Sequence, residues 1–191
     1  MKSLFSTACL ILCLLSLVAG ATAQNQINFA SLPLVGSPMP VPNGYAGFNW
    51  TNILYVDPAE WQSAGPGYKL SSSPNQNVAF VGGVTCLIPQ RGENCWGSIS
   101  INSNSGSGGI HNPLSFQLVS ATVAGGFGPT TITVVAYNNG NYVGSAFYDL
   151  SGQLQTINFP ASWGGLTEVT FQTAAMGDLV IYNLQAYWLL G

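Results

Sequence analysis

Short runs of alternating hydrophobic and polar residues make up most of the chain, and clusters of Gly, Pro, Asn and Ser separate them. The runs are rich in Val, Ile, Thr, Tyr and Phe, and none keeps the period of an amphipathic helix. This pattern is typical of an all-β sandwich or barrel. It predicts about nine antiparallel strands, over residues 46–55, 78–84, 97–102, 114–123, 130–137, 142–150, 154–159, 166–172 and 179–188.

The clearest predicted unit is a β-hairpin around Asn139-Gly140, because both residue types tolerate a positive φ angle. Alternation in its first strand predicts three core-facing residues, namely Ile132, Val134 and Ala136. The same alternation in the last predicted strand places four residues on one face, namely Val180, Tyr182, Leu184 and Ala186. These two units therefore predict strands with one buried face.

One segment, residues 58–62, suggests a short helical turn. Pro58 suits the first helical position, and the side chain of Asp57 can cap the turn. Residues 102–112 are rich in Ser, Gly and Asn and indicate a loop rather than a domain linker, because the strand pattern resumes directly after them. The chain is therefore expected to hold one folded domain.

The N-terminus has the pattern of a cleavable signal peptide over residues 1–23. Lys2 supplies the positive charge, residues 4–18 are mostly apolar, and Ala21-Thr22-Ala23 is a small-x-small cleavage site. A membrane anchor is the alternative, but the apolar core is shorter than the roughly 20 residues that a spanning helix needs. We therefore expect a secreted protein with one β-sandwich domain over residues 24–191 and no transmembrane segment.

After cleavage only two cations remain, Lys69 and Arg91, against six acidic residues, so two minus six gives a net charge of −4. This charge offers no basic surface for nucleic acid or anionic lipid. Amide and hydroxyl side chains must supply the solubility, and such surfaces suit neutral ligands.

Cys86 and Cys95 are the two cysteines outside the predicted signal peptide, and a disulfide between them is expected in an oxidising compartment. The single histidine, His111, adds too few ligands for a metal site, so no metal or cofactor is expected. Asn49-Trp50-Thr51 is the one glycosylation sequon. Asn49 either carries a glycan or is an ordinary strand residue, and the sequence leaves both open.

Two motifs carry a resemblance to a known group of proteins. The first predicted strand holds Tyr-x-Gly-x-x-Trp at residues 45–50, and the last holds Leu-Val-Ile-Tyr-Asn-Leu at 179–184. In this order, with the hairpin between them, they resemble small secreted jelly-roll domains of fungal proteins and of bacterial exported proteins with sorting tails. These domains are similar to galactose-binding-like carbohydrate-binding modules.

The resemblance implies a two-layer jelly roll with a role at extracellular glycans. One position departs from the pattern, because such domains commonly carry Asp where this chain has Tyr182. The resemblance therefore implies no metal site here.

Catalysis receives little support from the sequence. A glycosidase needs two carboxylates about 5–10 Å apart. Asp57 and Glu60 could face the same way on a turn, but Asp57 before Pro58 is more simply a cap. The other carboxylates are dispersed, and His111 lacks the Gly-x-Ser-x-Gly motif of a serine hydrolase. We therefore expect no enzyme activity.

Aromatic residues beside loops are the candidates for binding a sugar, because flat rings stack on the C–H faces of sugars. The strongest candidates are Trp163, with glycines beside it, and Trp96, next to Cys95. Further candidates are Tyr142 and Asn141 at the hairpin tip, and Trp61. The aromatic residues within strand patterns are expected in the core, namely Trp50, Phe80, Phe116, Phe147, Phe159 and Phe171.

Three functions remain open on this basis. The first is a non-catalytic extracellular domain that binds neutral carbohydrate of a cell wall or matrix. The second is a structural or host-interaction protein that binds a protein partner through an exposed apolar patch. The third is a glycan-active hydrolase, which requires two carboxylates in one groove.

Overall fold

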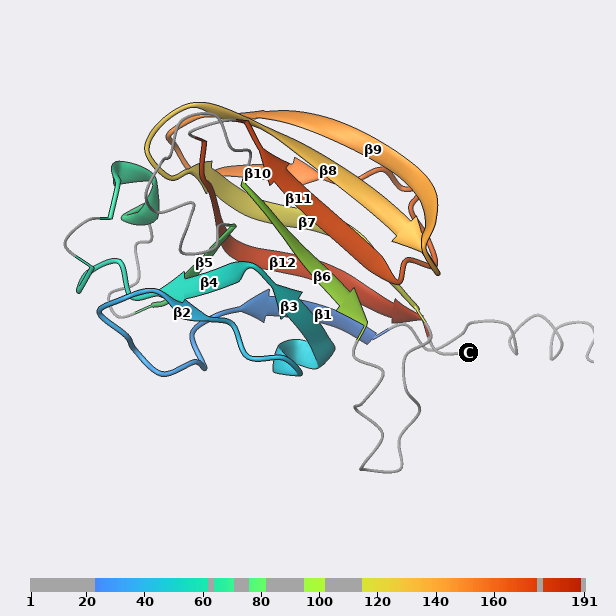
Figure 1. Cartoon of the computed structure of the whole chain (residues 1–191), viewed down its shortest axis with the longest axis horizontal. Coiled ribbons are helices and arrows are strands. Elements are labelled where there is room, and N and C mark those ends of the chain that lie inside the picture. The colour runs from blue at the N-terminus through green and yellow to red at the C-terminus, as the bar shows by residue number, and fades with distance from the viewer. Residues whose placement is uncertain are drawn as a thin grey trace, which may run out of the picture.

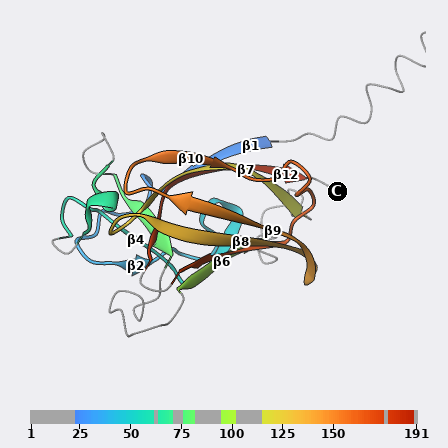
Figure 2. The ribbon, with the colours of Figure 1, turned by 90° about the horizontal axis from the view of Figure 1, so that it is seen from above.

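The structure, a computed structural model, describes residues 23–61, 64–70, 76–81, 95–101, 115–174 and 177–189. Two antiparallel sheets lie on each other, as the two views show (Figure 1, Figure 2). The predicted all-β antiparallel sandwich is therefore confirmed. Among the described residues, no helix is long and apolar enough to cross a membrane.

One sheet has seven strands, in the order β10-β7-β12-β5-β4-β2, with β1 also paired to β12. These strands are β1 (Ala23–Asn28), β2 (Met39–Pro40), β4 (Ile53–Val56), β5 (Val78–Val81), β7 (Ser115–Gly125), β10 (Gln155–Asn158) and β12 (Leu179–Leu189). The other sheet has the order β3-β6-β11-β8-β9. Its strands are β3 (Phe48–Thr51), β6 (Trp96–Ile101), β8 (Thr130–Asn138), β9 (Asn141–Leu150) and β11 (Glu168–Thr173).

The described residues form twelve strands where the sequence predicted about nine. The predicted strand 46–55 is two strands in different sheets, β3 and β4, because the chain turns at Asn52 with a φ of 52°. Asparagine is one of the few residue types with a side chain that adopts this conformation readily. The short β2 and the N-terminal β1 were not predicted, since neither shows a run of β-branched residues.

The predicted helical turn at 58–62 is a single hydrogen-bonded turn over residues 58–60, and residue 62 lies outside the described residues. The backbone N–H of Trp61 donates to the Asp57 carbonyl at 3.1 Å, and Asp57 Oδ1 accepts from the Ala59 N–H at 2.9 Å. The cap is therefore present without a helix. Two 3₁₀ turns lie elsewhere, at η1 (Tyr45–Gly47) and η2 (Pro66–Tyr68).

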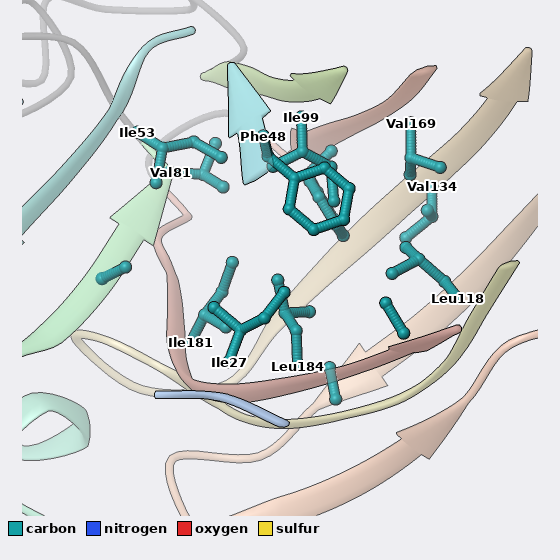
Figure 3. Packing of buried hydrophobic residues seen from close by; sticks show 14 of the residues in the cluster. Ile27, Phe48, Ile53, Val81, Ile99, Leu118, Val134, Val169, Ile181 and Leu184 are labelled. Atoms are coloured by element: carbon teal, nitrogen blue, oxygen red, sulfur yellow. The ribbon is translucent and has the colours of Figure 1, made fainter. Parts of the chain in front are cut away.

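The hydrophobic core lies between the two sheets, and Figure 3 shows side chains from both layers meeting there. Ile132, Val134 and Ala136 of β8 are fully buried in it, as predicted. The hairpin from β8 to β9 turns at Asn139 and Gly140, whose φ angles are 48° and 78°. This is the twisted turn that Asn-Gly favours, and the prediction is confirmed.

One predicted alternation is wrong. The register of β12 against β7 shifts between Ile181 and Asn183, which is the mark of a β-bulge at Tyr182. Before the bulge, Leu179 and Ile181 face the core, and after it Leu184 does. Val180 and Tyr182 therefore lie on the opposite side of the sheet from Leu184 and Ala186.

That opposite side carries a second hydrophobic cluster, which covers the outside of the seven-stranded sheet. It is formed by Leu54, Val56, Tyr68, Val78, Phe80, Ala124, Val180 and Tyr182. The Tyr182 hydroxyl donates to the Gly67 carbonyl at 2.7 Å and accepts from the Leu70 N–H at 3.0 Å. These bonds hold the η2 segment over the sheet. The five-stranded sheet has no such cover among the described residues.

Candidate functional site: the outer face of the five-stranded sheet

Alternate residues of the five-stranded sheet point away from the core and form what we call the outer face. Its residues are Asn49, Thr51, Trp96, Ser98, Ser100, Thr131, Thr133, Val135, Tyr137, Tyr142, Ser145, Phe147, Asp149, Glu168, Thr170 and Gln172. Most are amides, hydroxyls or aromatic rings. The outer face therefore combines flat rings with neutral hydrogen-bonding groups.

One cross-strand row of the outer face begins and ends with an exposed aromatic ring. Trp96 pairs with Gln172, Gln172 with Thr133, and Thr133 with Phe147. Trp96 is 48% exposed and Phe147 is 72% exposed. The two rings are three strand spacings apart, or about 14 Å. We call this set of four residues the Trp96–Phe147 row.

The position of Trp96 is fixed by the strand beside it. The backbone N–H of Thr173 donates to the carbonyl of Cys95 at 2.8 Å, so the residue before Trp96 is tied to β11. A ring held in this way loses little conformational entropy when a ligand contacts it. Trp96 is thus exposed on the outer face, as a ring that stacks on a sugar has to be.

Tyr142 lies at another corner of the outer face, beside Tyr137. Their rings meet edge to face with centroids 6.5 Å apart, and the Tyr142 hydroxyl is 3.1 Å from the Ser145 hydroxyl. Tyr142 is 64% exposed, as the sequence predicted for the hairpin tip. Asn141, the first residue of β9, is also exposed and pairs with Asn138. Tyr142 therefore lies on the outer face, whereas Asn141 lies beside it at the hairpin tip, in the alternation of the opposite face.

Phe147 was expected in the core, and that expectation is wrong. It lies on β9 in the same alternation as Ser145 and Asp149, which both point outward. The alternate residue Tyr148 points inward instead, and its hydroxyl donates to the Asn158 carbonyl at 2.9 Å. The polar residues two positions before and after Phe147 were the signal in the sequence.

The expectation of an uncovered ring at Trp163 is also wrong, because Trp163 is only 3% exposed. Its ring stacks with that of Phe159 at a centroid distance of 6.3 Å. Gly144 of β9 leaves the space for it, since a Cβ at that position would lie 2.7 Å from Trp163 Nε1. The neighbouring strand therefore covers the ring that the adjacent glycines were expected to expose.

Trp61 does not lie on the outer face either. It is half-buried in the second hydrophobic cluster, where its ring stacks with Phe80 at 5.7 Å and meets Tyr68 edge to face at 5.1 Å. Trp61 anchors its loop to the seven-stranded sheet. The structure therefore brings Trp96 and Tyr142 to one face and places Asn141, Trp163 and Trp61 elsewhere.

The outer face carries two carboxylates and no cation among the described residues. Glu168 lies between Ser100 and Tyr137, and Asp149 lies opposite Thr131, whose hydroxyl donates to it at 3.0 Å. The registers place the two carboxylates six residues apart along β8, or about 20 Å. A glycosidase pair is about 5–10 Å apart, so Glu168 and Asp149 do not form one.

The other described carboxylates, Asp57, Glu60 and Asp178, do not lie on the outer face. Asp57 is buried and caps its turn, as expected, and Glu60 is exposed. Asp178 Oδ2 accepts from the Tyr68 hydroxyl. In the part of the chain that the structure covers, no three His, Cys, Asp or Glu side chains are placed to hold a metal ion.

No protein family model matches this sequence, and no curated protein matches it. Solved structures with a similar arrangement of strands include TmCBM61 in complex with β-1,4-galactotriose, at 12% identity and a TM-score of 0.38, over 77% of this chain and 94% of that chain. The agarase AgWH50C matches at 8% identity and a TM-score of 0.42, over 81% of this chain. The enzymatically active domain of tailspike protein 4 from bacteriophage CBA120 matches at 10% identity and 0.41, over 87% of this chain.

The chain spans 25% of the length of the agarase and 19% of the tailspike domain. Carbohydrate-binding modules are thus among the structures that this chain is similar to in fold. At these TM-scores the likeness does not extend to a ligand or an activity.

Three sequence predictions stay untested by the described residues: the disulfide, the signal peptide and the glycosylation of Asn49. Cys86, His111 and residues 1–22 lie outside the described residues, so the disulfide and the signal peptide stay predictions. Cys95 is described and is buried directly before β6. Asn49 of the sequon lies on the outer face, half-buried, with its Nδ2 3.4 Å from the Ile101 carbonyl. Its glycosylation stays a prediction.

Proposed function

We propose that this chain is an extracellular, non-catalytic domain that binds neutral carbohydrate on the outer face of its five-stranded sheet. The observation that carries the proposal is the Trp96–Phe147 row, in which two exposed rings lie at the ends and an amide and a hydroxyl lie between them. Rings stack on the C–H faces of a sugar, and the polar groups bond its hydroxyls.

The charge of the outer face supports a neutral ligand. Its charged residues are Glu168 and Asp149, and the one Lys or Arg among the described residues, Lys69, lies beside η2 over the other sheet. A glycan with carboxylate or sulfate groups would meet like charge there without a cation to pair with. Uncharged polysaccharides avoid this repulsion.

The proposal that the protein is secreted rests on the N-terminal pattern. Strand β1 begins at Ala23, which pairs with Trp188 of β12. Cleavage after Ala23 would remove one residue of this strand and leave the five pairs from Gln24 to Asn28. Mass spectrometry of the protein from the culture medium tests this. Absence of the protein from the medium would contradict secretion, and an exported protein that keeps residues 1–23 would contradict cleavage.

Affinity electrophoresis in neutral soluble polysaccharides, with pull-down on insoluble chitin, cellulose and β-glucan, tests the binding. Trp96→Ala and Phe147→Ala are each expected to weaken binding about tenfold, which corresponds to a loss of about 1.4 kcal/mol of stacking and contact energy. Phe127→Ala is the matched control. Phe127 is 57% exposed and packs edge to face on Tyr68, away from the outer face.

Two results would overturn the proposal. One is the absence of binding to any neutral polysaccharide. The other is binding that Phe127→Ala weakens as much as Trp96→Ala, since the ligand would then lie elsewhere. Release of reducing sugar from the bound polysaccharide would contradict the non-catalytic part alone.

A further inference from the structure

A second cross-strand row crosses the outer face, beside the Trp96–Phe147 row. Ser100 of β6 pairs with Glu168 of β11, Glu168 with Tyr137 of β8, and Tyr137 with Tyr142 of β9. We call these four residues the Glu168 row. The two rows are four residues apart along β6 and β11, or about 13 Å. A sugar that stacks within the Trp96–Phe147 row therefore does not reach the Glu168 row.

Glu168 is a carboxylate that no cation accompanies. It lies half-buried on β11, the central strand of the five-stranded sheet. The one described Lys or Arg, Lys69, lies beside η2 over the other sheet. Charged groups that lose part of their contact with water are usually paired. Within the part of the chain that the structure covers, the positive partner of Glu168 is missing, so a ligand with a positive group is favoured there.

Two tyrosine rings lie next to this carboxylate. Tyr137 is directly opposite Glu168, and the Cβ atoms of such a pair are about 4.5–5.5 Å apart. The ring of Tyr142 meets that of Tyr137 edge to face and is exposed to solvent. The face of a tyrosine ring attracts a cation, and a carboxylate accepts strong hydrogen bonds from an ammonium group. An ammonium group placed at this row therefore gains both interactions.

We propose that the Glu168 row is a second subsite of the outer face, and that it binds a protonated amino sugar of a polysaccharide. The ammonium group of the sugar donates to the carboxylate of Glu168, and the sugar ring lies against the exposed ring of Tyr142. Ser100, on the other side of Glu168, offers a hydroxyl to the hydroxyls of the sugar. The inference rests on the proposed function in one respect, namely that the ligand of the outer face is a glycan.

The groups around Glu168 favour an amino sugar over other amines. A lysine side chain or a polyamine also carries an ammonium group, but it has no ring hydroxyls for Ser100 and no rigid C–H face for Tyr142. A polysaccharide in which only part of the amino groups is acetylated suits both rows. Its neutral sugars fit the Trp96–Phe147 row, its free amines fit the Glu168 row, and different stretches of one polymer can occupy the two rows.

Isothermal titration calorimetry with glucosamine oligosaccharides tests the subsite. The same oligosaccharides after N-acetylation are the matched ligands, because acetylation removes the positive charge and leaves the chain length unchanged. At a mildly acidic pH that keeps the amines protonated, the wild-type protein should bind the amine form about fivefold more tightly. Added salt should remove this preference and leave binding of the acetylated form unchanged.

Variants of the row separate its charge from its rings. Glu168→Gln should lower the affinity for the amine form about fivefold, to that of the acetylated form. Tyr142→Leu should lower it about threefold, whereas Tyr142→Phe should keep it, because the ring face attracts the cation. Asp149→Asn is the matched control and should change it less than twofold. Asp149 carries the same charge on the same face, but it accepts from the Thr131 hydroxyl and lies about 20 Å from Glu168.

Three results would overturn the inference. The first is equal affinity for the amine and acetylated forms, and the second is an equal loss in Glu168→Gln and Asp149→Asn, since the net charge alone would then decide binding. The third is a lysine oligomer that competes as well as the amino sugar. If neutral polysaccharides bind through Trp96 without any preference for amines, this inference fails and the proposed function stands. Absence of binding to every polysaccharide, charged or neutral, would overturn both.

Discussion

The hydroxyl of Tyr68 donates a hydrogen bond to Oδ2 of Asp178, across the outside of the seven-stranded sheet. Gly126 packs against both residues, since a Cβ there would lie 2.6 Å from the Tyr68 ring and 3.1 Å from Asp178 Oδ2. Burial raises the pKa of Asp178 to about 7, although a hydrogen bond from the backbone of Leu179 acts in the other direction. The Asp178 carboxyl is therefore a group that titrates near neutral pH.

This pKa predicts that the protein loses stability as the pH rises through about 7. The pKa of Asp178 is above its ordinary value of 3.8, so the folded state binds a proton more tightly than the unfolded state. The stabilisation is complete below pH 3.8 and is lost as the pH rises through about 7. Its size is below about 4 kcal/mol, because Asp178 keeps some contact with water.

Urea unfolding at several pH values, with Asp178→Asn beside the wild-type protein, measures this effect. The asparagine stays neutral and can still accept from Tyr68, so the free energy of unfolding of this variant should not fall between mildly acidic and mildly basic pH as the wild type's does. At basic pH the variant should be the more stable of the two. Parallel pH profiles for the two proteins would show that Asp178 does not titrate in this range.

The spacing within the Trp96–Phe147 row predicts that binding depends on the length of the glycan. A monosaccharide reaches one ring, whereas a chain of several sugars is needed to cover the roughly 14 Å between the two rings. Isothermal titration calorimetry with a series of neutral oligosaccharides should show affinity rising with length and then levelling off. In the Phe147→Ala variant the affinity should no longer rise for the longer oligosaccharides. The shortest ligands, which stack on Trp96 alone, should keep their affinity. Equal affinity for all lengths would contradict this prediction.

The carboxylates of the outer face predict discrimination between glycans by charge. Glu168 lies in a row with Ser100 and Tyr137, at a central strand of the sheet. Glu168→Gln should leave the affinity for a neutral polymer within about twofold and should improve retention by a polyuronate at low salt, because one repulsive charge is removed. Added salt should change neutral binding little. Tighter binding of the wild-type protein to the polyuronate than to the neutral polymer would contradict the prediction.

Alternation and turn chemistry predicted most of this fold, because both act over neighbouring residues. Ile132, Val134 and Ala136 are buried as expected, and the Asn139-Gly140 turn has the predicted backbone. The predicted strands and buried faces were wrong where a single residue interrupts the alternation of hydrophobic and polar positions. Asn52 sends the chain from one sheet to the other, and the bulge at Tyr182 reverses which side chains of β12 face the core.

The candidate site could be predicted only in part. Trp96 and Tyr142 are exposed, and each lies at the beginning of its strand, next to the loop or turn that the sequence indicated. Whether a ring is covered depends on residues that are distant in the sequence. For Trp163 the covering residue is Gly144 of the neighbouring strand. That residue is nineteen positions away, and no local pattern relates the two. Phe147, by contrast, was signalled by Ser145 and Asp149 in the same alternation.

The contact between Gly144 and Trp163 predicts a large difference between two glycine substitutions. A Cβ at Gly144 would lie 2.7 Å from Trp163 Nε1, and the ring is enclosed in the core and cannot move aside freely. Gly144→Ala should therefore lower the free energy of unfolding by about 1–3 kcal/mol through overpacking. Gly164, next to the same tryptophan, has nothing within 4 Å of the added atom, and its φ does not lie in the left-handed region.

Gly164→Ala should accordingly be neutral, or stabilising by about 0.4–1 kcal/mol through the unfolded state. Thermal and urea unfolding of the two variants measure both effects, and tryptophan fluorescence reports whether the Trp163 ring becomes exposed. If Trp163 instead stood free in solvent as a sugar-binding platform, Gly144→Ala would cost no stability and would not change its fluorescence. The pair of variants thus distinguishes a ring that supports the sheet from a ring that binds a ligand.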